Sequence, residues 1–363
     1  MLGWVRLRYG GGEPFPNRSG EPTLPDATIE VVAELGAPPG NVAVSSTGRV
    51  FFTFHPSASP TIKLAELVDG RPVPYPDGSF QSERDDGPWL DTPLGIRIDG
   101  RQRLWVLDNG DHGRRDTKLL AFDITTGKLV REHHFSSDTA PLGSHLNDLA
   151  VHPKGDRIYI ADASILRLSP ALVVYDIGQS RARRVLEGHE SVTAEPYVMT
   201  VDGEPVQVAG LFTLRPGVDS IALDRAGQWL YFAAMTATKL YRVPTAALDD
   251  PNLTADELGK RVEVVGDKTV SDGITTDAAG TIYLTDPEHN GVVTMGPKGE
   301  LTTLLKDPRL RWPDGFSFGP DGWLYVTCSA LQHVIMKSAE HTQAHGPYHI
   351  LRFKPGGTAP PGQ

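Results

Sequence analysis

A short stretch of similar sequence is repeated along the chain, and side chains that carry oxygen recur at the same position within it. Four of the residues at this position are Asn147, Asp219, Asp272 and Asp314. Carboxylates crowded together repel one another, so some must hold a proton, reach solvent or share a cation. A hard divalent ion such as Ca²⁺ suits an all-oxygen set and tolerates irregular geometry. Asp at such positions can instead accept backbone N–H bonds and fix a turn. We predict that Asn147, Asp219 and Asp272 bind a divalent metal, with Ca²⁺ favoured.

Other side chains near this set could take part in chemistry. Asp314 and Asp148 are the expected proton-transfer residues for a substrate held beside the ion. Trp312 and Met235 could form an apolar wall for a planar ligand, although burial in the core is the commoner fate of such residues. Three loop histidines are expected to reach the same face, namely His112, His145 and His289. Each could titrate near neutral pH. Of these, we predict that His112 and His289 contact the substrate.

Several other chemistries are disfavoured by the residues present. No GxSxG motif surrounds a serine, which argues against covalent hydrolysis. Cys328 is the single cysteine and the histidines show no zinc-type spacing, so a typical zinc site is not expected. Each copy of the repeated sequence is expected to form two strands. The second strands end at Asp108, Asp162 and Asp286, and we expect these residues to fix turns.

Six copies of one strand pair must position these residues. The aromatic residue of the second strand recurs at successive spacings of 54, 54, 72, 52 and 42 residues, at Phe51, Trp105, Tyr159, Tyr231, Tyr283 and Tyr325. Each copy alternates apolar and polar residues on both sides of a Gly or Asp-Gly turn, which is typical of a β-hairpin. A period of this size is that of a four-stranded propeller blade. The sequence therefore predicts an all-β protein, a six-bladed β-propeller.

The two ends of the chain are expected to close the ring together. The last repeat offers only the run 349–354 as an outer strand, which would leave its edge unpaired. The run 28–35 precedes the first repeat and has no local partner. We predict that it is the outermost strand of the last blade. The expected organisation is an N-terminal extension over 1–27, one propeller domain over 28–355 and a C-terminal tail over 356–363.

Composition limits the partners and the compartment. The formal net charge of −10 argues against a nucleic-acid binder, which needs a basic stripe. No apolar run approaches the roughly 18 residues that cross a bilayer, so no membrane span is expected. Arg6 and Arg8 interrupt the N-terminus, which does not resemble a signal peptide. The compartment stays open between the cytoplasm and, for a trimmed chain, a secreted or periplasmic location. The oligomeric state is open too.

Several segments of the sequence resemble those of a known protein family. LGIRID with LWVLDNG, LNDLAV with YIADAS, and GDKTVSDGITTDAAGTIYLTD are similar to the bacterial branch of the Yellow/major royal jelly protein family. The resemblance covers about residues 29–354. It implies a six-bladed propeller, distantly similar to the SMP-30/gluconolactonase propellers. The family mixes pigment-pathway proteins with ligand-binding proteins, so its fold transfers better than its function.

The resemblance to the SMP-30/gluconolactonase group implies a ligand set. That group holds its metal with a Glu from the first blade, an Asn from each of the third and fourth, and an Asp from the fifth. Asn147 and Asp272 match the third and fifth, and Asp219 replaces the fourth-blade Asn. Gly40 and Asn41 stand in the region of the first-blade Glu, so that ligand is missing.

Two classes of function remain open for a small-molecule substrate or ligand. The first is an enzyme that performs metal-assisted hydrolysis of a lactone or ester, or isomerises a cyclic carbonyl compound. The second is a non-catalytic binding protein for a small aromatic or amine ligand, for which carboxylates and aromatic walls are suited.

Overall fold

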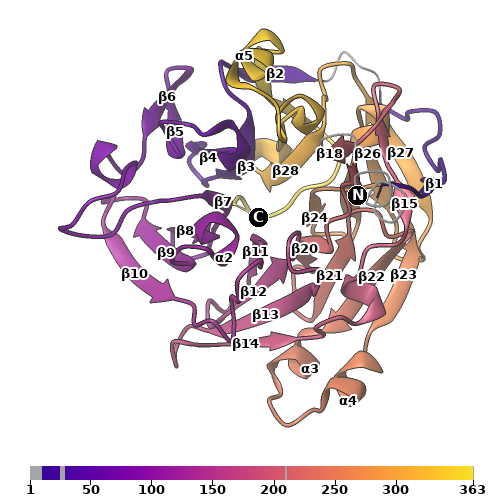
Figure 1. Cartoon of the computed structure of the whole chain (residues 1–363), viewed down its shortest axis with the longest axis horizontal. Helices are drawn as coiled ribbons and strands as arrows, with labels where there is room; N and C mark the ends of the chain where they lie inside the picture. Colours follow the sequence, from indigo (N-terminus) through magenta and orange to yellow (C-terminus); the bar gives the residue numbers. More distant parts are fainter. Residues whose placement is uncertain (1–9, 25–28, 209–210, 363) are drawn as a thin grey trace.

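Six sheets stand around a common centre in the computed structural model, which describes residues 10–24, 29–208 and 211–362. In these residues each large sheet has four antiparallel strands in a simple meander (Figure 1). The first strands of neighbouring sheets lie against one another around the centre. The prediction of an all-β, six-bladed β-propeller is confirmed.

The strands of the blades follow one another in chain order. Blades one to three are β3 (Pro39–Val44), β4 (Val50–Phe54), β5 (Leu64–Val68) and β6 (Arg71–Pro74); β7 (Pro93–Ile98), β8 (Arg103–Asp108), β9 (Lys118–Asp123) and β10 (Leu129–His134); β11 (Leu146–Val151), β12 (Arg157–Asp162), β13 (Ala171–Asp176) and β14 (Arg181–Val185). Blades four to six are β20 (Val218–Leu223), β21 (Trp229–Ala234), β22 (Lys239–Pro244) and β23 (Glu263–Asp267); β24 (Ile274–Thr276), β25 (Ile282–Asp286), β26 (Gly291–Met295) and β27 (Leu301–Lys306); β28 (Pro313–Phe318), β29 (Leu324–Cys328), β30 (Tyr348–Phe353) and β2 (Glu30–Leu35).

The repeated aromatic residue packs between adjacent blades. Phe51 of β4, for example, is fully buried in one cluster with Leu104 and Phe122 of the next blade. Trp105 of β8 is buried in the same way against Ile158 and Tyr175 of the third blade. Because both faces of each sheet are covered, large side chains on successive second strands are removed from water, and this burial is the main stabilising contribution.

The N-terminal strand closes the ring as predicted. β2 pairs antiparallel with β30, with Glu34 opposite His349 and Leu35 opposite Tyr348. Of the predicted run 28–35, Thr28 lies outside the described residues. The side chains of Ile29, Ala33 and Leu35 are buried. The two ends of the chain are therefore joined in one blade.

The segments outside the blades pack on the propeller. In the described part of the N-terminal extension, the backbone N–H groups of Thr23 and Leu24 donate to the carbonyl of Leu304, in β27. The C-terminal tail crosses the centre of the ring, where the Gly362 N–H donates to the Phe318 carbonyl and the Ile98 N–H donates to the Gly362 carbonyl (Figure 1). Since Ile98 and Phe318 end their inner strands, the tail covers the tunnel end opposite to the strand starts.

Short elements surround the blades. Between blades three and four the chain forms β15 (Tyr197–Val198), β16 (Thr200–Val201), β17 (Glu204–Pro205), β18 (Gln207–Val208) and β19 (Phe212–Thr213), and β15 pairs with β1 (Glu13–Pro14). The described helices are α2 (Gly110–Gly113), α3 (Thr245–Asp249), α4 (Ala255–Gly259) and α5 (Ala339–Ala344). Thr254 and Glu257 form a capping box at the start of α4. None of the helices that the structure describes is long and apolar enough to cross a bilayer.

Candidate functional site

Irregularities at the starts of the inner strands direct polar side chains toward one mouth of the tunnel. The ladders of β11, β20 and β28 shift register at Leu146/Leu149, Val218/Ser220 and Pro313/Phe316. Asn147, Asp219 and Asp314 lie inside these bulges. A bulge leaves its extra residue unpaired and turns its side chain away from the regular alternation.

Asp272 reaches the same mouth from just before β24. Its backbone N–H and that of Gly273 both donate to Thr285 Oγ1, at 2.9 Å each. Gly273 is required here because a Cβ would lie 1.8 Å from the Asp314 carbonyl oxygen of the next blade. The close approach of the two inner strands brings Asp272 and Asp314 to the same region.

A cavity of about 480 Å³ opens at this mouth. Its polar lining includes the four residues that the sequence predicted to converge, Asn147, Asp219, Asp272 and Asp314, with Trp312, Met235 and His112 beside them. Trp312 and Met235 belong to the apolar wall, as predicted. The rest of this wall was not predicted and comes mainly from connecting segments, through Ile165, Leu166, Val208, Leu214, Leu331, Ile335 and Met336. A few polar groups in an apolar pocket are typical of small-molecule sites.

Three of the polar residues form a continuous buried chain of contacts. Asn147 Nδ2 donates to Asp219 Oδ1, and the Asp219 carboxyl is hydrogen-bonded to that of Asp272. Trp312 Nε1 donates to Asp272 Oδ2 at 2.6 Å and fixes the orientation of that carboxylate. Asp314 is not part of this chain, since its carboxyl is hydrogen-bonded to Ser329.

Burial and mutual repulsion disfavour the charged forms of these acids. Burial first, and then the charge of Asp272, raises the pKa of Asp219 well above its usual value. Burial also raises the pKa of Asp272 to about 6. The pKa of Asp314 is raised well above its usual value by burial and by Asp272 and Asp219. Without a cation, the site must therefore retain protons near neutral pH.

Other buried aspartates near the tunnel have basic partners, and these three do not. Asp108 lies 3.5 Å from Lys118 Nζ, Asp162 lies 2.7 Å from an Arg184 nitrogen, and Asp286 lies 3.0 Å from His289 Nδ1. Within the ranges that the structure describes, Asp219, Asp272 and Asp314 form no salt bridge with Lys, Arg or His. The three acids thus have no counter-charge among the described residues when they ionise.

Asp108 and Asp162 act locally, as expected. Asp108 accepts the backbone N–H groups of Asp91 and Thr92 at 2.7 and 2.9 Å. Asp162 accepts those of His145 and Ser164 at 2.6 and 2.9 Å. The turn-fixing role predicted for both residues is confirmed.

Asp148 lies below the cavity and does not line it. Its carboxylate pairs with Arg97 Nη2 at 3.1 Å and accepts from Asn41 Nδ2 at 3.2 Å. Adjacent residues within the bulge diverge, so Asn147 faces the cavity while Asp148 enters the tunnel. The predicted proton transfer to a substrate by Asp148 has no support in this placement, because a buried ion pair already uses the group.

The first-blade position cannot supply the ligand found in the SMP-30/gluconolactonase group. A Cβ at Gly40 would lie 2.5 Å from Leu94 Cδ1 and 2.9 Å from Thr53 Oγ1. The neighbouring Asn41 is engaged with Arg97 and Asp148. An ion held at this mouth would therefore lack the first-blade ligand of that group.

The predicted histidines separate into two places. His112 lines the cavity and stacks on His145 with ring centroids 4.6 Å apart. Burial lowers the pKa of both rings, so they are neutral at pH 7. His289 does not line this cavity, because it turns back to Asp286, which raises its pKa. His55, which the sequence analysis missed, also lines the cavity; its position after a strand gives no signal that distinguishes it from a turn residue.

The fold and the site define a six-bladed β-propeller with an acidic, apolar-walled cavity at one mouth of its tunnel. A family model described as Major royal jelly protein matches residues 92–342, and the chain belongs to that family. Major royal jelly protein 1 of Apis mellifera is 30% identical over 196 residues, which are 50% of this chain and 43% of that protein. The chain thus spans less than half the length of this relative.

Solved structures share the architecture at low identity. A gluconolactonase from Xanthomonas campestris superposes with a TM-score of 0.57 at 13% identity, covering 95% of this chain and 98% of that one. The calcium-binding protein regucalcin from Agrobacterium tumefaciens gives a TM-score of 0.57 at 18% identity, covering 96% and 97%. At these identities the likeness shows the fold alone.

Proposed function

We propose that the cavity binds a divalent cation, Ca²⁺, through Asn147, Asp219 and Asp272, and that the protein is an enzyme acting on a small lactone, ester or cyclic carbonyl compound. The observation that carries the proposal is that Asp219, Asp272 and Asp314 line one cavity and none of them has a basic partner among the described residues. Every other tunnel aspartate described above has a basic partner. A bound divalent ion would supply the missing counter-charge and polarise a carbonyl oxygen.

The donor set fits a hard cation. Asp272 keeps one carboxylate oxygen free of the Trp312 bond, and rotation of the Asn147 amide would present its oxygen. Three protein ligands leave further positions of a six- to eight-coordinate ion for water or substrate. The names of two similar propellers, a gluconolactonase and a calcium-binding regucalcin, are compatible with this chemistry.

The remaining residues have separate tasks in the proposal. Asp314 lines the cavity without belonging to the contact chain. Because its pKa is raised, its carboxyl group holds a proton at neutral pH that it can donate to the substrate. His112 and His145 line the cavity with neutral rings, which would contact a polar group of the substrate. Met235 and Trp312 cover the apolar part of a substrate and exclude water.

The test is a panel of lactones and esters assayed with Ca²⁺ and with a chelator. We expect calcium-dependent turnover in the unmodified protein. Asp314→Asn should lower kcat by about 10²- to 10⁴-fold, the usual contribution of general acid–base catalysis, and preserve calcium binding. The exposed Asp85→Asn variant is the control. Calcium binding with no turnover of any substrate would contradict the enzyme assignment.

A binding protein for a cationic aromatic amine is the second candidate. The observation that favours it is the apolar wall beside the unpaired acids, which would hold an amine and its ring together. An amine that quenches tryptophan fluorescence in the presence of chelator, with no turnover, would support this function over the enzyme.

Calcium binding should weaken as the pH falls. The raised pKa values mean that the metal-free folded protein gains stability from protonated carboxylates below the ordinary value of 3.8, and loses it as the pH rises through the raised values. Ca²⁺ must displace these protons. We expect the calcium-induced rise in Tm to shrink between about pH 7.5 and about pH 5.5. Comparing calcium with chelator at each pH cancels the titration of the remaining histidines. A shift that is equal or larger at the lower pH would contradict the assignment of these carboxylates.

A further inference from the structure

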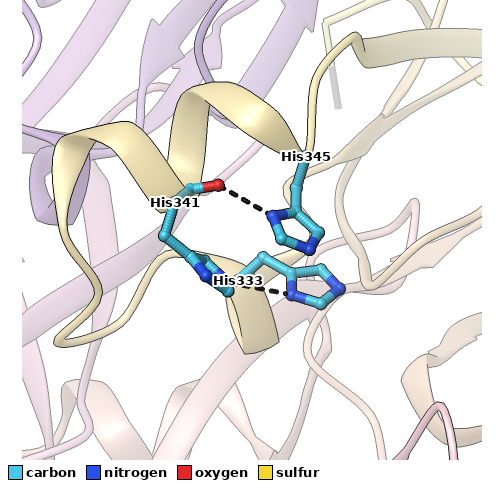
Figure 2. Close-up of side chains that lie close together, drawn as sticks. All are labelled: His333, His341 and His345. Carbon is cyan, nitrogen blue, oxygen red and sulfur yellow. Dashed lines mark hydrogen bonds between the residues drawn. The ribbon is translucent and has the colours of Figure 1, made fainter.

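Three histidines form a compact cluster outside the tunnel. They are His333, which ends the 3₁₀ turn η7 (Leu331–His333), His341 within α5, and His345 immediately after α5. One ring nitrogen of each lies within 4.8 Å of the other two, and in the described part of the chain no other three His, Cys, Asp or Glu side chains meet this condition. Figure 2 shows the three side chains directed toward one another.

One pair of ring nitrogens already has the spacing of two ligands of the same metal ion. His341 Nε2 and His333 Nδ1 are 3.3 Å apart. Zinc–nitrogen bonds of about 2.0–2.1 Å at a tetrahedral angle would set two ligand nitrogens about 3.3–3.4 Å apart. His341 and His345 are four residues apart, which places both on one side of a helical turn. No zinc-type spacing was expected from the sequence, because the third histidine comes from a separate turn that only the fold brings near.

Outer contacts orient two of the rings. His345 Nδ1 donates to the His341 carbonyl at 2.7 Å, which leaves Nε2 as the free ligand atom (Figure 2). His333 Nε2 lies 3.8 Å from Asp202 Oδ2, which leaves Nδ1 facing the cluster. A ligand histidine typically has its second nitrogen against a carbonyl or carboxylate in this way.

The backbone that carries the rings is held in place. Thr342 Oγ1 donates to the His333 carbonyl at 3.2 Å, which ties α5 to η7. Tyr348 Oη, fully buried, donates to the Thr342 carbonyl at 2.7 Å. Partial burial, followed by the neighbouring His345, lowers the pKa of His333 to about 4, so this ring is neutral at pH 7. A neutral imidazole is the form that binds metals.

We propose that His333, His341 and His345 bind a borderline divalent transition ion, Zn²⁺ in the first place, with a further coordination position open to water or a ligand. Imidazole suits Zn²⁺, Cu²⁺ and Ni²⁺ and is a poor ligand for Ca²⁺. The site is independent of the proposed calcium site. Leu331, Ile335 and Lys337 line both the large cavity and an adjoining hollow of about 230 Å³ that includes His333 and His341. An ion here would fix the segment that forms one wall of the cavity.

The experiment titrates Zn²⁺ into chelator-treated full-length protein without a histidine tag, by calorimetry and by thermal melting. We expect saturable binding of one ion and a rise in Tm. His341→Ala and His345→Ala should each raise Kd by more than the 10- to 100-fold typical for loss of an outer partner. Gln343→Ala, exposed on the same helix, and His134→Ala, beside Asp116 and Glu132, are matched controls that should bind like the unmodified protein.

Two results would overturn the proposal. One is the absence of saturable Zn²⁺ binding to the unmodified protein. The other is unchanged binding in both His341→Ala and His345→Ala, with loss in His134→Ala, which would place the ion elsewhere. Asp272→Asn separates the two metal sites: it should keep the Zn²⁺ response whether or not the calcium site exists.

Discussion

Replacing Asp272 by Ala is expected to abolish both the stabilisation by Ca²⁺ and the activity. The substitution removes one of three neighbouring acids, which relieves their mutual repulsion, but it leaves the Trp312 Nε1–H without its acceptor. It also removes a ligand. For the unmodified protein, Ca²⁺ at 100 times Kd adds about 2.7 kcal/mol, which should raise Tm by several degrees, whereas the variant should show no shift.

Two further variants make this result interpretable. Asp272→Asn keeps an acceptor for Trp312 Nε1, so a loss of the calcium response in this variant cannot be attributed to an unpaired indole N–H. Asp85→Asn removes an exposed charge and should respond to Ca²⁺ like the unmodified protein. A calcium-induced rise in Tm that survives Asp272→Ala would exclude Asp272 as a ligand.

Deleting residues 1–35 is expected to cause the largest loss of stability. The deletion removes β2, its ladder with β30 and the buried side chains of Ile29 and Leu35. Each such side chain contributes about 1.5–3 kcal/mol by burial, and each ladder hydrogen bond about 1 kcal/mol net. The sum approaches the total stability of a typical domain. Thermal melting should show Tm lowered by about 10 °C or more, or no cooperative transition.

Point variants on the same strand provide the control. Leu35→Asp places a charge at a side chain that is 2% exposed, and it should reproduce much of the deletion. Val31→Asp changes a side chain that is 43% exposed and should alter Tm little. Equal effects of the two substitutions, or an unchanged melt after the deletion, would contradict closure of the ring by β2.

The fold could be predicted because the same pattern of strands and buried aromatic residues occurs in every blade. Each second strand carries a large aromatic residue that must be buried between blades, so Trp105 and Tyr159 mark the blades even where loops differ in length. Closure followed from counting strands, since the last blade was one strand short. The register of Asn147, Asp219, Asp272 and Asp314 followed from their equivalent places in the repeats, and all four line the cavity.

The features of the site that could not be predicted depend on segments outside the repeats. Asp148 follows Asn147 directly, and only the geometry of the bulge decides which of the two faces the cavity and which pairs with Arg97. Much of the apolar wall comes from connecting segments such as 331–336. The repeated sequence of the blades does not determine the path of these segments. The histidine cluster joins a 3₁₀ turn to a short helix for the same reason. His289 was misplaced because a loop position does not reveal that its ring pairs with Asp286.

The acids at the tunnel mouth are proposed to hold a divalent cation. The most direct test of this proposal is anomalous X-ray scattering from crystals grown with Ca²⁺. We predict one strong peak bounded by Asn147, Asp219 and Asp272, with water or ligand completing the coordination. Saturating Ca²⁺ with no peak there, and with Asp219 and Asp272 still in contact through a shared proton, would contradict the account.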